Sequence, residues 1–171
     1  MPSKKPARKA SASPSKPKAK PQPAAPAAPR QTVLDRSDIH RILFDLAHQV
    51  APADLETLMD NEAMLIERAR GLTDANLALF QKQLSLAMAC VRDHVDGECS
   101  QIPYYTISLI GAALMYFADE FDAIPDFLPD IGHLDDAVVM AMACELGADG
   151  LQRYCDFKDI DATGLLPPRR N

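Results

Sequence analysis

The chain has 171 residues and a formal net charge of −6, and this sum hides a marked separation of charge. Residues 1–30 carry eight lysines and arginines and no acidic residue, whereas residues 31–171 carry ten basic and 24 acidic residues, a net charge of −14. The length fits one globular domain with a tail and is short for two domains. The acidic balance after residue 30 disfavours a folded nucleic-acid-binding domain.

Residues 1–32 are predicted to form a disordered basic tail. The first 30 residues hold eight of the 14 prolines and none of the ten aromatic residues, so they lack the side chains that build a core. No apolar run follows the basic start, which excludes a secretory signal peptide and favours a cytoplasmic protein, or one attached to the cytoplasmic side of a membrane. The tail either keeps the chain soluble or binds an anionic membrane surface, and nucleic acid is disfavoured because no aromatic ring is present to stack on bases.

Helical periodicity begins after the tail and predicts four helices before residue 98. The first carries apolar residues at three- and four-residue steps from Ile39 to Val50. The expected signals that start or end these four helices are Ser37, Pro52, Asn61, Gly71, Thr73 and Gly97. No segment shows the alternation of a half-buried strand, so the sequence predicts an all-α domain.

The segment Cys99–Ala118 contains 20 residues without a charge. Ser100 and Pro103 mark the expected helix start. Its apolar part, Ile102–Ala118, would extend about 25 Å at ~1.5 Å per residue, the low end for a bilayer core of ~30 Å. A helix that is apolar on every face is either a buried central helix or a marginal membrane span, and we favour the central helix.

An acidic turn follows between residues 119 and 136. Pro125 and Pro129 exclude a continuous helix, and Gly132 supplies a turn. Asp135 and Asp136 are expected to begin a helix that continues to Leu146. Apolar residues interleave with the acidic ones, so the turn is expected to be packed and its carboxylates to need partners.

Three interpretations of these carboxylates stay open. In the first they stabilise the fold, by accepting backbone N–H bonds in the turn and by capping the helix. In the second they bind a divalent cation such as Ca²⁺ or Mg²⁺, although the EF-hand spacing is absent. In the third, paired carboxylates act with His133 in hydrolysis or elimination. The candidate metal ligands are Asp122, Asp126, Asp130, Asp135 and Asp136.

The four cysteines are expected to be free thiols in a reducing compartment, because none forms a C-x-x-C pair. A zinc site is a weaker alternative. It would use Cys90, His94 and Cys99, with a fourth ligand from Cys144 or Cys155.

The acidic turn resembles the signature of the YkvA-type domain-of-unknown-function family. The matching positions are Tyr116, Asp122, Ile124, Pro125, Asp126, Phe127, Leu128, Pro129, Gly132, Leu134, Asp135 and Asp136. The resemblance covers roughly residues 102–146 and leaves out residues 33–98. This sequence has Asp119 and Glu120 at the two positions where the family usually has Ser-Pro.

This resemblance implies no established activity. Members of the YkvA-type family are often described as membrane proteins and occur fused to unrelated modules, which suits an interaction or localisation domain. We therefore predict one small helical bundle over residues 33–160, flanked by the tail 1–32 and a C-terminal tail 161–171. The predicted function is a non-catalytic adaptor or scaffold that binds a protein partner and associates with a membrane, with no cofactor. The alternative is a divalent-metal-binding module or a metal-dependent enzyme that uses the turn 119–136.

Overall fold

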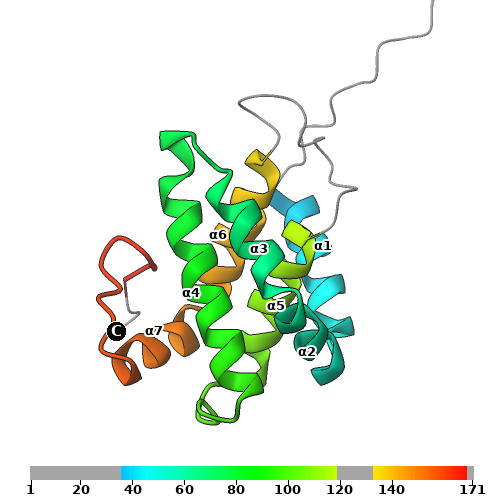
Figure 1. The fold of residues 1–171 in the computed structure, drawn as a ribbon, viewed down its shortest axis with the longest axis vertical. Helices are drawn as coiled ribbons and strands as arrows, with labels where there is room; N and C mark the ends of the chain where they lie inside the picture. Colours follow the sequence, from blue (N-terminus) through cyan, green and yellow to red (C-terminus); the bar gives the residue numbers. More distant parts are fainter. Residues whose placement is uncertain (1–35, 119–132, 169–171) are drawn as a thin grey trace, which may run out of the picture. The chain divides into compact units, whose positions relative to one another are not determined.

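The computed structural model describes residues 36–118 and 133–168, all within the unit Thr32–Asn171 (Figure 1). These described residues form seven α-helices and one short 3₁₀ helix, with no strand among them, which confirms the all-α prediction. The predicted disorder of residues 1–32 lies outside the described residues. In chain order the elements are α1 (Arg36–Gln49), α2 (Pro52–Asp60), α3 (Glu62–Arg70), η1 (Ala75–Leu77), α4 (Ala78–Val95), α5 (Tyr104–Ala118), α6 (Leu134–Leu146) and α7 (Ala148–Phe157).

The uncharged segment forms the centre of the domain. Helix α5 packs against α1, α4 and α6, and it also contacts α2 and α7 (Figure 1). Ten of its 15 residues are buried, including Ile107, Leu109, Ile110 and Leu114, each with no exposed surface. Burying one such side chain contributes about 1.5–3 kcal/mol, so α5 supplies a large part of the hydrophobic stabilisation.

The alternative interpretation of this segment is a membrane span. Of the helices in residues 36–118 and 133–168, none is both long enough and apolar enough to cross a bilayer. Helix α5 begins at Tyr104 rather than near Ser100, because the Pro103 carbonyl accepts the first hydrogen bonds, from the N–H groups of Thr106 (2.9 Å) and Ile107 (3.3 Å). The structure therefore supports the central-helix interpretation.

Several predicted helix signals are confirmed and others are placed differently. Pro52 is the first residue of α2, and Gly97 follows α4 with a φ of 78°. Asn61 precedes α3, but its side-chain amide donates to the Thr57 carbonyl (2.8 Å) instead of capping α3. The fourth helix does not begin at Thr73: Asp74 accepts a hydrogen bond from Asn76 N (2.8 Å) and caps η1, and α4 follows.

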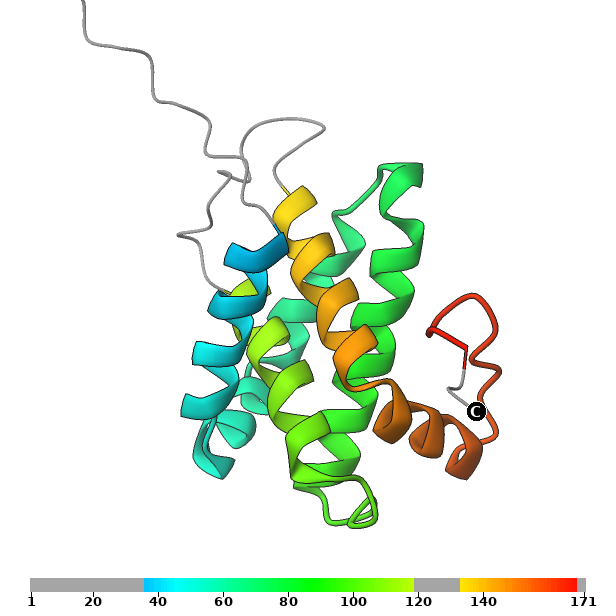
Figure 2. The same cartoon turned by 180° about the vertical axis from the view of Figure 1, so that it is seen from behind.

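Helix α7 was not predicted from the sequence. It follows α6 after a single residue, Gly147, and turns away from the axis of α6 (Figure 2). Close packing with the start of α5 fixes this turn, because a Cβ atom placed on Gly150 would lie 2.2 Å from Thr106 Oγ1. At its other end, Tyr154 donates to Asp93 Oδ2 on α4 (2.8 Å).

Residues 161–168, assigned from the sequence to a C-terminal tail, pack on α4 and α7. Two buried glutamines hold their backbone. Gln83 Nε2 donates to the Leu165 carbonyl (3.1 Å), and Gln152 Nε2 donates to the Pro167 carbonyl. Leu166 is buried and belongs to the same core as the helices. We call residues 161–168 the C-terminal strap.

All four cysteines are free thiols, as predicted, and all are buried. Burial raises the pKa of each thiol, to about 12 for Cys144, so the thiols stay protonated and unreactive in the folded protein. In the part of the chain that the structure describes, no three His, Cys, Asp or Glu side chains are arranged to hold a metal ion. The zinc alternative built on Cys90, His94 and Cys99 is therefore not supported.

Candidate acidic site at the start of α6

The candidate site centres on two consecutive aspartates in the first turn of α6. Asp135 and Asp136 follow Leu134, the first residue of the helix, and His133 precedes it. Both aspartates are buried, with 5% and 2% of their surface exposed. Carboxylates at this end of a helix are favoured by the helix dipole and by N–H groups that lack a partner within the helix. The prediction that these two residues open the helix is confirmed.

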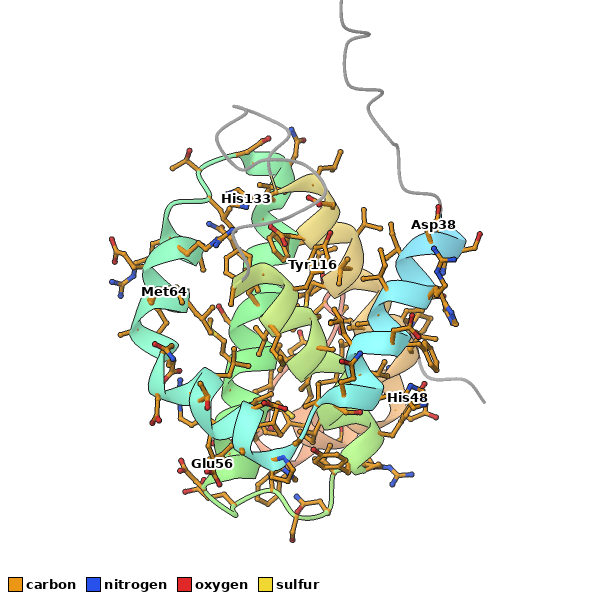
Figure 3. The ribbon with its side chains drawn as sticks, turned by 90° about the vertical axis from the view of Figure 1, so that its right-hand side faces the viewer. Asp38, His48, Glu56, Met64, Tyr116 and His133 are labelled. Atoms are coloured by element: carbon orange, nitrogen blue, oxygen red, sulfur yellow. The ribbon has the colours of Figure 1, made fainter. Side chains whose placement is uncertain are left out.

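Each buried carboxylate has a side-chain partner. Tyr116, near the end of α5, donates its hydroxyl hydrogen to Asp135 Oδ2 (3.1 Å). His133 places Nδ1 3.1 Å from Asp136 Oδ2. Figure 3 shows Tyr116 and His133 at the same end of the domain, away from His48 and Glu56. The Tyr116–Asp135 contact joins the end of α5 to the start of α6, whereas the His133–Asp136 contact lies within the start of α6.

An aromatic ring lies beneath the histidine. The Phe117 ring centroid is 6.2 Å from that of His133, and the Arg68 guanidinium carbon lies 5.0 Å from the Phe117 centroid. Phe80 of α4 packs edge-on against Phe117 at 5.6 Å. The end of α5 therefore connects the acidic site to α3 and α4. A cation over an aromatic face contributes about 0.5–1 kcal/mol at a partly exposed site.

Arg68, Phe80 and Phe117 were not identified from the sequence as neighbours of the site. Arg68 and Phe80 belong to helices outside the resemblance, and helical periodicity shows only that a residue is on an apolar face, not which distant helix it meets. Tyr116 did carry a signal, because it is part of the motif that resembles the YkvA-type family.

The other predicted site residues lie outside the described residues. They are Asp122, Pro125, Asp126, Pro129, Asp130 and Gly132. Of the five candidate metal ligands, the structure thus describes only Asp135 and Asp136. It places this pair beside Tyr116 and His133. The divalent-cation interpretation stays a prediction.

The exposure of Asp136 and His133 limits what these two side chains can do chemically. The Asp136 side chain has no exposed surface, whereas 23% of the His133 side chain is exposed. Of these two side chains, solvent therefore contacts that of His133 and not the carboxylate of Asp136. The carboxylate of Asp136 fixes the imidazole ring through Nδ1, and a protonated imidazole would make this contact an ion pair. The arrangement is that of a buried, hydrogen-bonded helix start.

Comparison with known protein families gives one match in this part of the chain. The described fold and site define an all-α domain whose central helix leads into a buried acidic helix start. Residues 106–142 match the family described as Protein of unknown function (DUF1232). The match runs from the first turn of α5 into α6 and includes Tyr116, His133 and both buried aspartates. It is consistent with the YkvA-type family predicted from the motif. Neither the search of curated proteins nor that of solved structures found a match.

Proposed function

We propose that this protein is a non-catalytic helical adaptor or scaffold, and that the motif aspartates stabilise the domain. The observation that carries the proposal is the burial of Asp135 and Asp136 with one oxygen of each held by Tyr116 and His133. A buried carboxylate that accepts hydrogen bonds from its own domain stabilises the fold without needing a substrate.

The position of the motif supports this role. A helix such as α5, with ten buried residues, fixes the central packing of the domain, and the motif joins it directly to its main neighbour α6. A domain held together in this way presents its remaining helices, α1 to α4 and α7, as surfaces for a partner. The basic residues of the segment 1–30 would add an electrostatic contact.

The stabilising role is tested by a double-mutant cycle. We expect Asp135→Asn to lower the free energy of unfolding by about 1–3 kcal/mol, because a buried hydrogen bond to a charged acceptor is weakened. Tyr116→Phe should cost about 0.5–1.5 kcal/mol, and the double variant should cost less than the sum because both changes remove the same contact. Urea denaturation followed by circular dichroism measures all three. Asp149→Asn is the matched control, since Asp149 also lies in the first turn of a helix but is exposed.

The alternative is a divalent-metal-binding module or metal-dependent enzyme built on Asp122, Asp126, Asp130, Asp135 and Asp136. Titration calorimetry of the full chain with Ca²⁺, Mg²⁺ and Mn²⁺ separates the two functions. Under the adaptor proposal there is no saturable heat and no rise in melting temperature. Saturable binding that Asp135→Asn abolishes, while the far-ultraviolet spectrum stays unchanged, would replace the adaptor proposal with the metal site.

A further inference from the structure

Large apolar side chains are exposed at one end of the domain. Of the nine exposed large apolar residues within 36–118 and 133–168, five lie at the end of α4, at the start of α5 and at or just after the end of α7. These helix ends lie toward the same end of the domain (Figure 1 and Figure 2). An exposed apolar patch on a folded domain is typical of an interaction surface. We call the five residues the end patch: Val95, Tyr104, Tyr105, Phe157 and Ile160.

The two sides of the end patch are connected through α4. The ring centroid of Tyr104 lies 6.0 Å from that of His94. On the other side, Lys158 Nζ lies 5.7 Å from the ring centroid of Phe157 and 2.7 Å from Asp93 Oδ2. Asp93 and His94 are adjacent in the last turn of α4, so these contacts place the aromatic rings of α5 and α7 on either side of one helix end. The end patch therefore spans the end of α4.

Acidic residues lie next to the end patch. Residues 93–98 and 153–161 contain six acidic and two basic residues, a net charge of −4. One of the two bases, Lys158, already pairs with two of the acids, at 2.7 and 3.2 Å. Asp96 and Asp159 are exposed, each is next to a patch residue in the sequence, and neither makes an ion pair within the described residues. A partner that complements this surface is apolar at its centre and basic at its edges.

Building on the adaptor function proposed above, we propose that the end patch binds a basic amphipathic helix of a partner protein. Such a helix presents apolar residues at three- and four-residue steps along one face, and these pack on the aromatic rings of the patch. Its lysines and arginines pair with Asp96 and Asp159 at the edge of the patch. An anionic membrane is disfavoured as the partner, because its headgroups are repelled by the same carboxylates.

Titration of the ¹⁵N-labelled full chain with a synthetic peptide tests this surface. The peptide has about 14 residues of leucine and lysine with one apolar face, and is ~21 Å long as a helix. We expect saturable shifts that are largest at residues 93–105 and 153–161, at peptide concentrations below about 100 μM. A peptide of the same composition, scrambled so that it has no apolar face, should bind at least about tenfold more weakly. Equal binding of the two peptides, or shifts only outside these residues, would overturn the proposal.

Two pairs of variants separate the apolar from the electrostatic contribution. Tyr105→Ser should weaken peptide binding about tenfold, whereas Met64→Ser, on α3 and similarly exposed (47% against 51%), should leave it unchanged. Asp96→Lys should weaken binding about fivefold. Glu67→Lys makes the same change of charge at an exposed position on α3 and should alter binding less than about twofold. Equal effects within either pair would contradict the assignment of the end patch.

The result is distinguishable from a failure of the adaptor function itself. If the peptide does not bind and the metal titration gives no saturable heat, the adaptor function stands and the end patch is not its partner site. If the peptide does not bind and phosphatidylserine vesicles broaden the signals of residues 93–105 and 153–161, the end patch contacts a membrane instead. Saturable metal binding that Asp135→Asn abolishes would overturn both proposals.

Discussion

Single side chains decide the packing of this domain where helices approach most closely. Asp135 and Asp136 are tolerated in the core because Tyr116 and His133 bond to them. Gly150 shows the opposite requirement, since its neighbour Thr106 leaves no room for a side chain. In both cases a contact with α5 or with a residue next to the helix start determines which amino acid the position accepts. The helix propensity of that amino acid does not.

Gly150 provides a sharp test of this packing. Alanine is favoured over glycine by up to about 1 kcal/mol inside a helix. However, a Cβ atom on Gly150 would lie 2.2 Å from Thr106 Oγ1 and 2.8 Å from Thr106 Cβ, and overpacking of this kind costs about 1–3 kcal/mol. We expect Gly150→Ala to destabilise the domain by about 1–2 kcal/mol in urea denaturation. A stability equal to or above that of the wild type would show that α7 can move away from α5.

Thr106→Ala offers an internal control for this variant. It removes the nearest atom, so Gly150→Ala should cost less in the Thr106→Ala background than alone. Simple additivity of the two changes would mean that the cost of Gly150→Ala has another origin.

At the scale of the elements, the end of α7 is joined to the end of α4 by a polar contact. Asp93 accepts a hydrogen bond from Tyr154 (2.8 Å), and Lys158 Nζ lies 2.7 Å from the same oxygen. Partial burial opposes ionisation of Asp93, but hydrogen bonds from Lys158 and Tyr154 outweigh it and lower the pKa of this carboxyl below its usual range. The contact therefore depends on pH.

The direction of that dependence follows from the lowered pKa. Because the folded state holds Asp93 ionised at a pH where the unfolded chain begins to bind a proton, the contact stabilises the fold above about pH 4. This stability is lost as the pH falls through the lowered folded value. We expect Asp93→Asn to flatten the loss of stability between about pH 5 and pH 3, measured by urea denaturation at each pH.

The exposed neighbour Asp96 is the matched control for this experiment. Asp96→Asn should keep the acid dependence of the wild type. An unchanged slope in Asp93→Asn would mean that other carboxylates account for the acid sensitivity of the domain.

The elements differ in how well the sequence predicts them. Helices α1, α2, α3 and α6 follow from apolar spacing together with Pro52, Gly71 and Gly147, because these are local signals. Helix α7 was missed because it follows α6 without a loop, and its position depends on Thr106, more than 40 residues earlier. The start of α4 was placed too early because Asp74 caps a 3₁₀ turn that precedes it.

The candidate site was predictable in part for the same reason. Asp135, Asp136 and Tyr116 belong to one short motif and could be singled out from the sequence. The partnership of Phe117 with Arg68 and Phe80 depends on contacts between helices far apart in the chain, which no local pattern encodes.

At the scale of the whole molecule, the dominant feature is the separation of charge between residues 1–30 and the rest of the chain. Eight basic residues near an anionic bilayer contribute about 1 kcal/mol each before screening by salt. We propose that this segment directs the domain to an anionic membrane surface.

Removal of residues 1–30 tests this role. We expect the truncated chain to lose most of its sedimentation with phosphatidylserine-containing vesicles, and the full chain to lose it when salt is raised. Vesicles of neutral lipid are the control and should bind neither chain. Equal sedimentation of the two chains with anionic vesicles would overturn the role of the segment.

The four buried cysteines determine when this domain can be oxidised. They lie on α4, in the loop after it, on α6 and on α7, so they sample much of the core. Because each thiol is protonated and shielded while its surroundings are folded, an oxidant modifies it only during a transient opening. A sulfinic or sulfonic group could not return to such an apolar site, so an opening in which a thiol is oxidised that far would become irreversible. The extent of cysteine oxidation would then depend on how often the domain opens locally, and not on the solvent exposure of the thiols in the folded state.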